Sequence, residues 1–165
     1  MANLVGLTVA RNSMVDFDLR KKGVKPELGR MFVYASSETH SSIQKAVELL
    51  GLGSDSLRLI PVNKDFEIDV STLEKTIALD RENGNVPFCI VGNAGTVNTG
   101  AIDNLDALAD ISQREKLWYH VDGAFGAWAV LSPENSSRLK GMERADSLAF
   151  DLHKWMYMPY DIGCI

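Results

Sequence analysis

Short apolar runs alternate with amphipathic segments along most of the chain. The amphipathic segments carry apolar side chains three or four residues apart, which is the period of a helix with one buried face. A chain that alternates strand and helix forms βαβ units, and these build a mainly parallel sheet with helices on both faces. The sequence therefore predicts an α/β fold, with strands expected at residues 31–35, 57–62, 87–91, 117–121 and 145–150 and a further strand beginning at 162–165.

Polar residues at fixed spacings suggest where the helices begin. A Ser followed three residues later by Glu or Gln can satisfy the first free N–H groups of a helix as a capping box. Ser41 with Gln44 and Ser71 with Glu74 have this spacing, and Asp103 precedes a third helical pattern. We therefore expect capping boxes at the first two sites and an aspartate cap at the third.

Composition excludes several functional classes. The chain has 165 residues, a net charge of -5 and 45% apolar residues, which suits one globular domain. Without a basic run there is no signature of nucleic-acid binding, and the longest apolar run, residues 123–131, is too short to span a bilayer. Cys89 and Cys164 match no metal or disulfide spacing. We expect a cytoplasmic protein with no metal, nucleic-acid or membrane partner.

Chemically versatile side chains follow the predicted strands. In open α/β sheets, ligands bind beyond the carboxyl ends of the strands. Each position alone has a structural explanation, such as turn formation or a loop before a helix. Their convergence on one edge of one sheet instead favours a ligand site made of His40, Asn93, Thr96, Asp122, His153 and Lys154.

Lys154 lies inside the apolar and aromatic run 149–156. Burying an ammonium group is costly, so such a lysine loses its proton or finds a partner. A neutral amine is a nucleophile suited to Schiff-base chemistry. The alternative is a lysine whose stem lies on apolar surface while its amine stays in water.

Pyridoxal phosphate is one ligand that accounts for these residue types together. Its aldehyde needs an amine, which Lys154 offers. Its pyridine nitrogen must stay protonated to act as an electron sink, and a carboxylate such as Asp122 stabilises that proton. The flat imidazole of His40 can stack on the ring.

Four segments give the chain a resemblance to a known family. The sequence is similar to the group II pyridoxal-phosphate-dependent amino-acid decarboxylases, and the similarity extends over almost the whole chain. That family has the aspartate-aminotransferase-like type I fold. The segments are Thr-His-Ser-Ser at 39–42, Gly-Thr-Val-Asn-Thr-Gly-Ala-Ile-Asp at 95–103, His-Val-Asp-Gly-Ala at 120–124, and Ala-Asp-Ser at 145–147 leading to His-Lys-Trp at 153–155.

The resemblance implies a catalytic group of three residues. Lys154 would form the Schiff base with the cofactor, Asp122 would pair with the pyridinium nitrogen, and His40 would stack on the ring and take part in protonation. The reaction implied is decarboxylation of an L-amino acid to an amine and carbon dioxide. The enzyme would be a carboxy-lyase and, at full length, a homodimer.

The resemblance also implies further cofactor contacts. Ala124 would pack near the ring and Thr96 beside it, while Ser147 and His153 would lie near the phosphate. Asp151 stands where relatives have a polar residue that touches the phosphate, and a carboxylate there is unfavourable.

The family pattern continues beyond both ends of this sequence. A Gly/Ser-rich phosphate loop is expected immediately before Ala2, and a C-terminal domain with a mobile tyrosine loop is expected after Ile165. We therefore interpret residues 1–165 as a partial cofactor-binding large domain with no second domain.

Other functions are open at this point. The chain could be a non-catalytic fragment or pseudoenzyme, or another type I enzyme such as an aminotransferase or a sulfur-removing lyase. A nicotinamide-binding domain is disfavoured because no Gly-x-Gly-x-x-Gly follows the first predicted strand. The substrate is open too, since aromatic amino acids and glutamate both have decarboxylases in the family.

Overall fold

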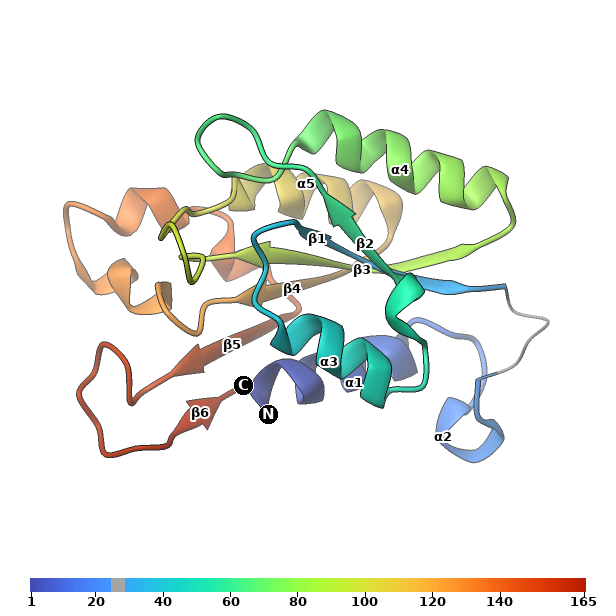
Figure 1. The fold of residues 1–165 in the computed structure, drawn as a ribbon, viewed down its shortest axis with the longest axis horizontal. Helices are drawn as coiled ribbons and strands as arrows, with labels where there is room; N and C mark the ends of the chain where they lie inside the picture. Colours follow the sequence, from blue (N-terminus) through green and yellow to red (C-terminus); the bar gives the residue numbers. More distant parts are fainter. Residues whose placement is uncertain (25–28) are drawn as a thin grey trace.

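A six-stranded sheet in the order β2-β1-β3-β4-β5-β6 forms the centre of the molecule (Figure 1). The computed structural model describes residues 1–24 and 29–165. Neighbouring strands are parallel from β2 to β5, and β6 pairs antiparallel with β5. This confirms the predicted mainly parallel α/β sheet. The strands are β1 (Met31–Ser36), β2 (Leu57–Ile60), β3 (Val86–Asn93), β4 (Trp118–Asp122), β5 (Ser147–Asp151) and β6 (Gly163–Cys164).

Helices cover both faces of this sheet. In Figure 1, α4 (Val70–Glu82) and α5 (Leu105–Glu115) lie above the sheet, and α1 (Ala2–Ser13) and α3 (Ser42–Leu49) lie below it. Every residue of β1 is buried, because alternate side chains enter the two opposite cores. Phe32 and Tyr34 join the core under α4 and α5, whereas Val33 and Ala35 join the core over α1 and α3.

Both predicted capping boxes are wrong. The Ser41 side chain makes no capping hydrogen bond to α3. For α4, Asp69 is the cap, and its carboxylate accepts a 2.6 Å hydrogen bond from the Thr72 N–H. Ser71 therefore lies inside the helix, because the Asp69 carboxylate two residues earlier already occupies the capping position and satisfies the Thr72 N–H.

The cap of α5 is also displaced from the predicted residue. Asn104 caps this helix by accepting from the Ala107 N–H. Asp103 is instead 2% exposed and accepts hydrogen bonds from the backbone of Ile68 and from the backbone and side chain of Asn93. It ties the loop before α4 to the end of β3.

The connections are short outside two regions. The connection between α1 and β1 contains α2 (Leu19–Lys22), and part of it, residues 25–28, lies outside the described residues. Between β4 and β5 the chain forms 3₁₀ turns at Ala127–Leu131, Ser136–Leu139 and Met142–Arg144. Within the described ranges, no helix combines the length and the apolar character needed to cross a bilayer.

Candidate active site

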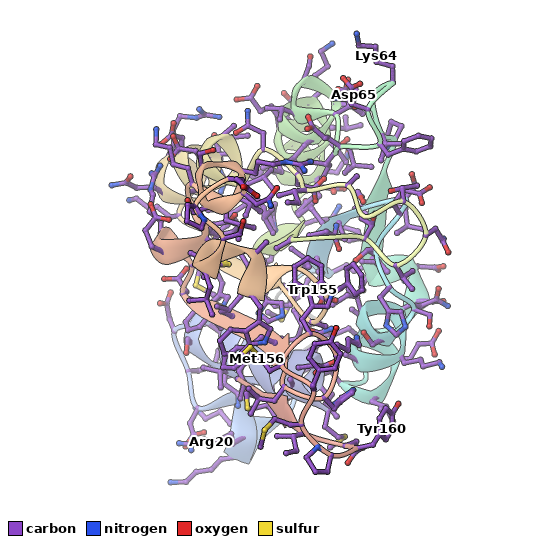
Figure 2. The ribbon with its side chains drawn as sticks, turned by 90° about the vertical axis from the view of Figure 1, so that its left-hand side faces the viewer. Arg20, Lys64, Asp65, Trp155, Met156 and Tyr160 are labelled. Carbon is purple, nitrogen blue, oxygen red and sulfur yellow. The ribbon has the colours of Figure 1, made fainter. Side chains whose placement is uncertain are left out.

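A cavity of about 290 Å³ lies at the carboxyl ends of the parallel strands. Figure 2 views the molecule from this side, with Trp155 and Met156 near the middle of the face. Parallel strands end at the same edge of a sheet, so residues far apart in sequence meet there. The lining includes His40, Asn93, Thr96, Asp122, Ala124 and Lys154.

Asp122 ends β4 and is only 7% exposed. Its two carboxylate oxygens have different partners. Oδ1 accepts a 3.2 Å hydrogen bond from the Ala124 N–H, and Oδ2 accepts a 2.8 Å hydrogen bond from Asn3 Nδ2. Since a carboxylate oxygen accepts two hydrogen bonds, each oxygen keeps accepting capacity toward the cavity.

His40 lies in the exposed loop between β1 and α3. Its Nδ1 accepts from the Ser42 backbone N–H at 3.2 Å and lies 2.9 Å from Ser42 Oγ. The preceding residue, Thr39, donates its hydroxyl to Asn93 Oδ1 at 3.2 Å. These bonds attach the imidazole at the mouth of the cavity to the buried end of β3.

Lys154 is partly exposed, which agrees with the alternative of a lysine whose amine stays in contact with water. Its side chain is 39% exposed, and the neighbouring Trp155 is 43% exposed, because the chain leaves the sheet after β5 in a turn that faces outward. Its Nζ lies 2.8 Å from Asp151 Oδ2. The lysine has therefore found a partner at the cavity edge, the second of the two outcomes expected for a costly ammonium.

Thr96 lies in a tight loop after β3. It is 4% exposed, and its hydroxyl is 2.7 Å from the Thr99 hydroxyl and accepts from the Ala101 N–H. The preceding Gly95 has φ +88 and touches Gly126, where a Cβ would approach the opposite backbone to 3.2 Å. This glycine lets the loop lie close under the cavity.

Two predicted phosphate contacts, Ser147 and His153, lie outside the lining of the cavity. Ser147 Oγ accepts from Trp118 Nε1 and lies 2.8 Å from His120 Nδ1. The His153 side chain is 10% exposed, and its Nδ1 is engaged with the backbone of Ile162. Both side chains support the elements that carry the site.

Sequence reasoning did not identify Asn3 and His120 as site residues. Asn3 bridges Asp122 and His120, through its Nδ2 and its Oδ1 respectively. His120 could have been found, because residues two apart on a strand face the same side. Asn3 gave no such signal, since only the packing of α1 on the sheet brings it to Asp122. Burial lowers the pKa of His120 to about 4.

Comparison with known proteins identifies the family. The model of the pyridoxal-dependent decarboxylase conserved domain matches residues 1–165. The chain belongs to this family. It is 43% identical over 165 residues to an aromatic-L-amino-acid decarboxylase of Bacillus atrophaeus, covering 100% of this chain and 32% of that protein.

Solved structures of family members have the same fold. A glutamate decarboxylase domain from Vibrio parahaemolyticus, part of a protein described as a diaminobutyrate-pyruvate transaminase and L-2,4-diaminobutyrate decarboxylase, superposes with a TM-score of 0.93 at 36% identity, over 98% of this chain and 36% of that one. Oryza sativa TDC with PLP gives a TM-score of 0.87 at 35% identity, over 99% and 34%. The chain thus spans about a third of the length of these relatives.

Proposed function

We propose that this chain is the cofactor-binding part of a pyridoxal-phosphate-dependent L-amino-acid decarboxylase, a carboxy-lyase. Residues 1–165 would be a partial large domain of that enzyme. One observation carries the proposal: Lys154, Asp122 and His40 line the same cavity at the ends of β5, β4 and β1. The family match over the full chain supports the same cofactor and reaction.

The donor set of the cavity fits the cofactor. Lys154 supplies an amine, Asp122 a buried carboxylate with accepting capacity toward the cavity, and His40 a flat ring at the mouth. Met1 and Ala2, at the start of α1, also line the cavity, and the free N–H groups of a helix N-terminus favour a phosphate. When bound, pyridoxal phosphate supplies the aldehyde and the electron sink that decarboxylation requires.

Each side chain then has a separate task. Asp122 holds the proton on the pyridine nitrogen, and its own oxygens are kept in place by Asn3 and the Ala124 N–H. His40, from the loop before α3, would stack on the ring and take part in protonation. Lys154 must leave Asp151 and lose a proton before its amine can react.

Asp151 is better placed to hold Lys154 than to hold a phosphate. Its Oδ2 lies 2.8 Å from Lys154 Nζ and 3.7 Å from His153 Nε2. A carboxylate next to a phosphate is repelled, whereas a carboxylate next to an ammonium is attracted. In the proposed enzyme, the free N–H groups at the start of α1 would therefore hold the phosphate, and Asp151 would hold Lys154.

The proposal extends to the full-length protein. Its substrate is an L-amino acid, because the relatives named above are described as decarboxylases of L-amino acids. It is a homodimer, and the exposed apolar side chains of Trp155, Met156, Tyr157 and Tyr160 offer an apolar surface for contacts in the full-length enzyme. It is cytoplasmic, as the two free cysteines suggest for a reducing compartment.

The test is covalent trapping of the cofactor. The purified chain is incubated with pyridoxal phosphate, reduced with borohydride, and mapped by peptide mass spectrometry. We expect label on the Lys154 peptide, loss of that label in Lys154→Ala, and unchanged label in Lys64→Ala, a lysine that Figure 2 shows far from Trp155. Label that persists after Lys154→Ala, or that is spread evenly over surface lysines, would contradict the proposal.

A further inference from the structure

A continuous series of hydrogen bonds runs behind the cavity and joins five parts of the molecule. It begins at β4 and β5, passes through α1 and the first residue of α3, and ends in the loop before α3. Asp122 accepts a hydrogen bond from one member of the series, Asn3. In order, the series is Trp118 Nε1 to Ser147 Oγ at 2.8 Å, Ser147 Oγ to His120 Nδ1 at 2.8 Å, His120 Nε2 to Asn3 Oδ1 at 3.0 Å, Asn3 Nδ2 to Ser42 Oγ at 2.9 Å, and Ser42 Oγ to His40 Nδ1 at 2.9 Å.

The direction of these bonds follows from Asp122. An ionised carboxylate only accepts, so the Asn3 amide must present its NH₂ to Asp122 and its carbonyl oxygen to His120. His120 Nε2 must then carry a hydrogen to donate to that oxygen. In a neutral imidazole the other nitrogen, Nδ1, is an acceptor, and the Ser147 hydroxyl lies in position to donate to it.

The far ends of the series agree with this direction. An indole N–H only donates, so Trp118 occupies an acceptor position of Ser147 and leaves its hydrogen for His120. On the other side, the Asn3 NH₂ donates to Ser42, whose hydroxyl is then free to donate to His40 Nδ1. His40 therefore also carries its ring hydrogen on Nε2.

We propose that Asn3 is the positioning residue of the site, and that His120 fixes the orientation in which Asn3 works. With its amide held by His120, Asn3 sets the direction of the Asp122 carboxylate and, through Ser42, that of the His40 ring. The part of this inference that concerns the cofactor rests on the proposed function. The tautomers and orientations do not depend on it.

The surroundings of His120 keep its imidazole neutral. The side chain is 0% exposed, and this burial lowers its pKa, which outweighs the opposite effect of the Asp122 carboxylate on the same strand. Asn3 from α1 and Ser147 from β5 carry no charge. Cys89, on the neighbouring β3, has a thiol whose pKa is raised by burial and is therefore neutral as well.

Nitrogen NMR of the ligand-free chain tests the tautomers directly. The chain has three histidines, so spectra of His120→Gln and His40→Gln assign the two rings. We expect His120 with a protonated Nε2 and an unprotonated Nδ1, unchanged from about pH 8 down to about pH 5. A hydrogen on Nδ1 of His120 in that range would overturn the inference.

A nearly isosteric variant separates positioning from packing. Asn3→Asp keeps the shape of the side chain but replaces the NH₂ donor with an acceptor. Asn12→Asp makes the same change at the other end of α1 and is the control. We expect Asn3→Asp to raise the pKa of His120 by more than about one unit and to weaken pyridoxal phosphate capture about tenfold, with Asn12→Asp unchanged.

The two readouts distinguish the inference from the proposed function. The first outcome is that His120 shows the expected tautomer, its pKa rises in Asn3→Asp, and no variant captures the cofactor. The positioning role of Asn3 then stands and the proposed function fails. If Lys154 is labelled while the His120 titration is the same in wild type and Asn3→Asp, the proposed function stands and the positioning role of Asn3 is wrong.

Discussion

The two sides of the candidate site are held in different ways. On the β4 side, Asp122 is 7% exposed, and it is bonded to Asn3, which in turn bonds the 0% exposed His120. On the β5 side, Lys154 is 39% exposed and is held by one ion pair to Asp151. The carboxylate side is therefore preorganised, whereas the amine side has to change its partner when it reacts.

This difference suits the chemistry proposed for the two groups. A carboxylate that holds a proton on a ring acts best when its geometry is fixed in advance. A lysine that must leave its carboxylate partner before its amine can react needs freedom to move. We expect variants on the β4 side to change stability and variants on the β5 side to change the rate of cofactor attachment.

The largest effect on stability is expected from pH. Burial lowers the pKa of His120 to about 4 from an ordinary value of 6.5, so between these values the unfolded chain binds a proton that the folded chain does not. The stability contribution is complete above about pH 6.5 and is lost as the pH falls toward about 4, by about 3 kcal/mol. Urea unfolding of wild type and His120→Gln measures it.

The His120 comparison isolates this residue because other groups are shared by both proteins. Burial raises the pKa of Asp103, for example, which gives a pH dependence of opposite sign in wild type and variant alike. Parallel curves of unfolding free energy against pH for the two proteins would show that His120 titrates normally, and the β4 side would then not be preorganised as described.

The next effect concerns the contact between α1 and His120. A Cβ added at Gly6 would lie 2.8 Å from His120 Cε1 and 2.9 Å from its Nδ1. Alanine normally stabilises a helix relative to glycine, but here we expect Gly6→Ala to destabilise the chain by about 2 kcal/mol, because the imidazole is held on both nitrogens.

Thermal or urea unfolding checks this prediction. Val5→Ala, at a position 43% exposed in the same helix, is the control for helix propensity. A Gly6→Ala chain as stable as wild type would mean that α1 or the imidazole moves easily, and the hydrogen-bond series would not be rigid.

The smallest effect is expected on the lysine side. Asp151→Asn removes the carboxylate that holds Lys154, and a partly exposed pair of this kind contributes about 1 kcal/mol. We therefore expect attachment of pyridoxal phosphate to be about fivefold faster, with little change in unfolding free energy. Stopped-flow absorbance measures the rate, and Asp161→Asn, in the same connection between β5 and β6, controls for the change in charge.

Slower attachment in Asp151→Asn would contradict this description. It would mean that the carboxylate assists the reaction of the amine rather than holding it back.

The sequence was a good guide to the fold and a partial guide to the site. The strands were predictable because both faces of the sheet are buried, which leaves continuous apolar runs such as β1. His40, Asp122 and Lys154 were expected at one sheet edge, and all three line the cavity; their catalytic roles stay predictions.

What the sequence could not supply depends on tertiary contacts. Asp69 and Asn104 took the capping positions because only the folded backbone decides which carboxylate or amide reaches the first N–H groups. For Lys154 the sequence left both a buried amine and a water-exposed amine open, and the turn after β5 leaves the side chain 39% exposed. Asn3 entered the site through the docking of α1, which no local pattern encodes.

The central claim is that the carboxylate side of the site is preorganised and the amine side is not. Hydrogen–deuterium exchange of the chain, with and without pyridoxal phosphate, tests this most directly. We expect the amides of 118–124 to be protected in both states, since this side is preformed, and the amides of 152–161 to become protected only when the cofactor is bound. Exchange in 152–161 that is unaffected by the cofactor, or rapid exchange in 118–124 without it, would contradict the account.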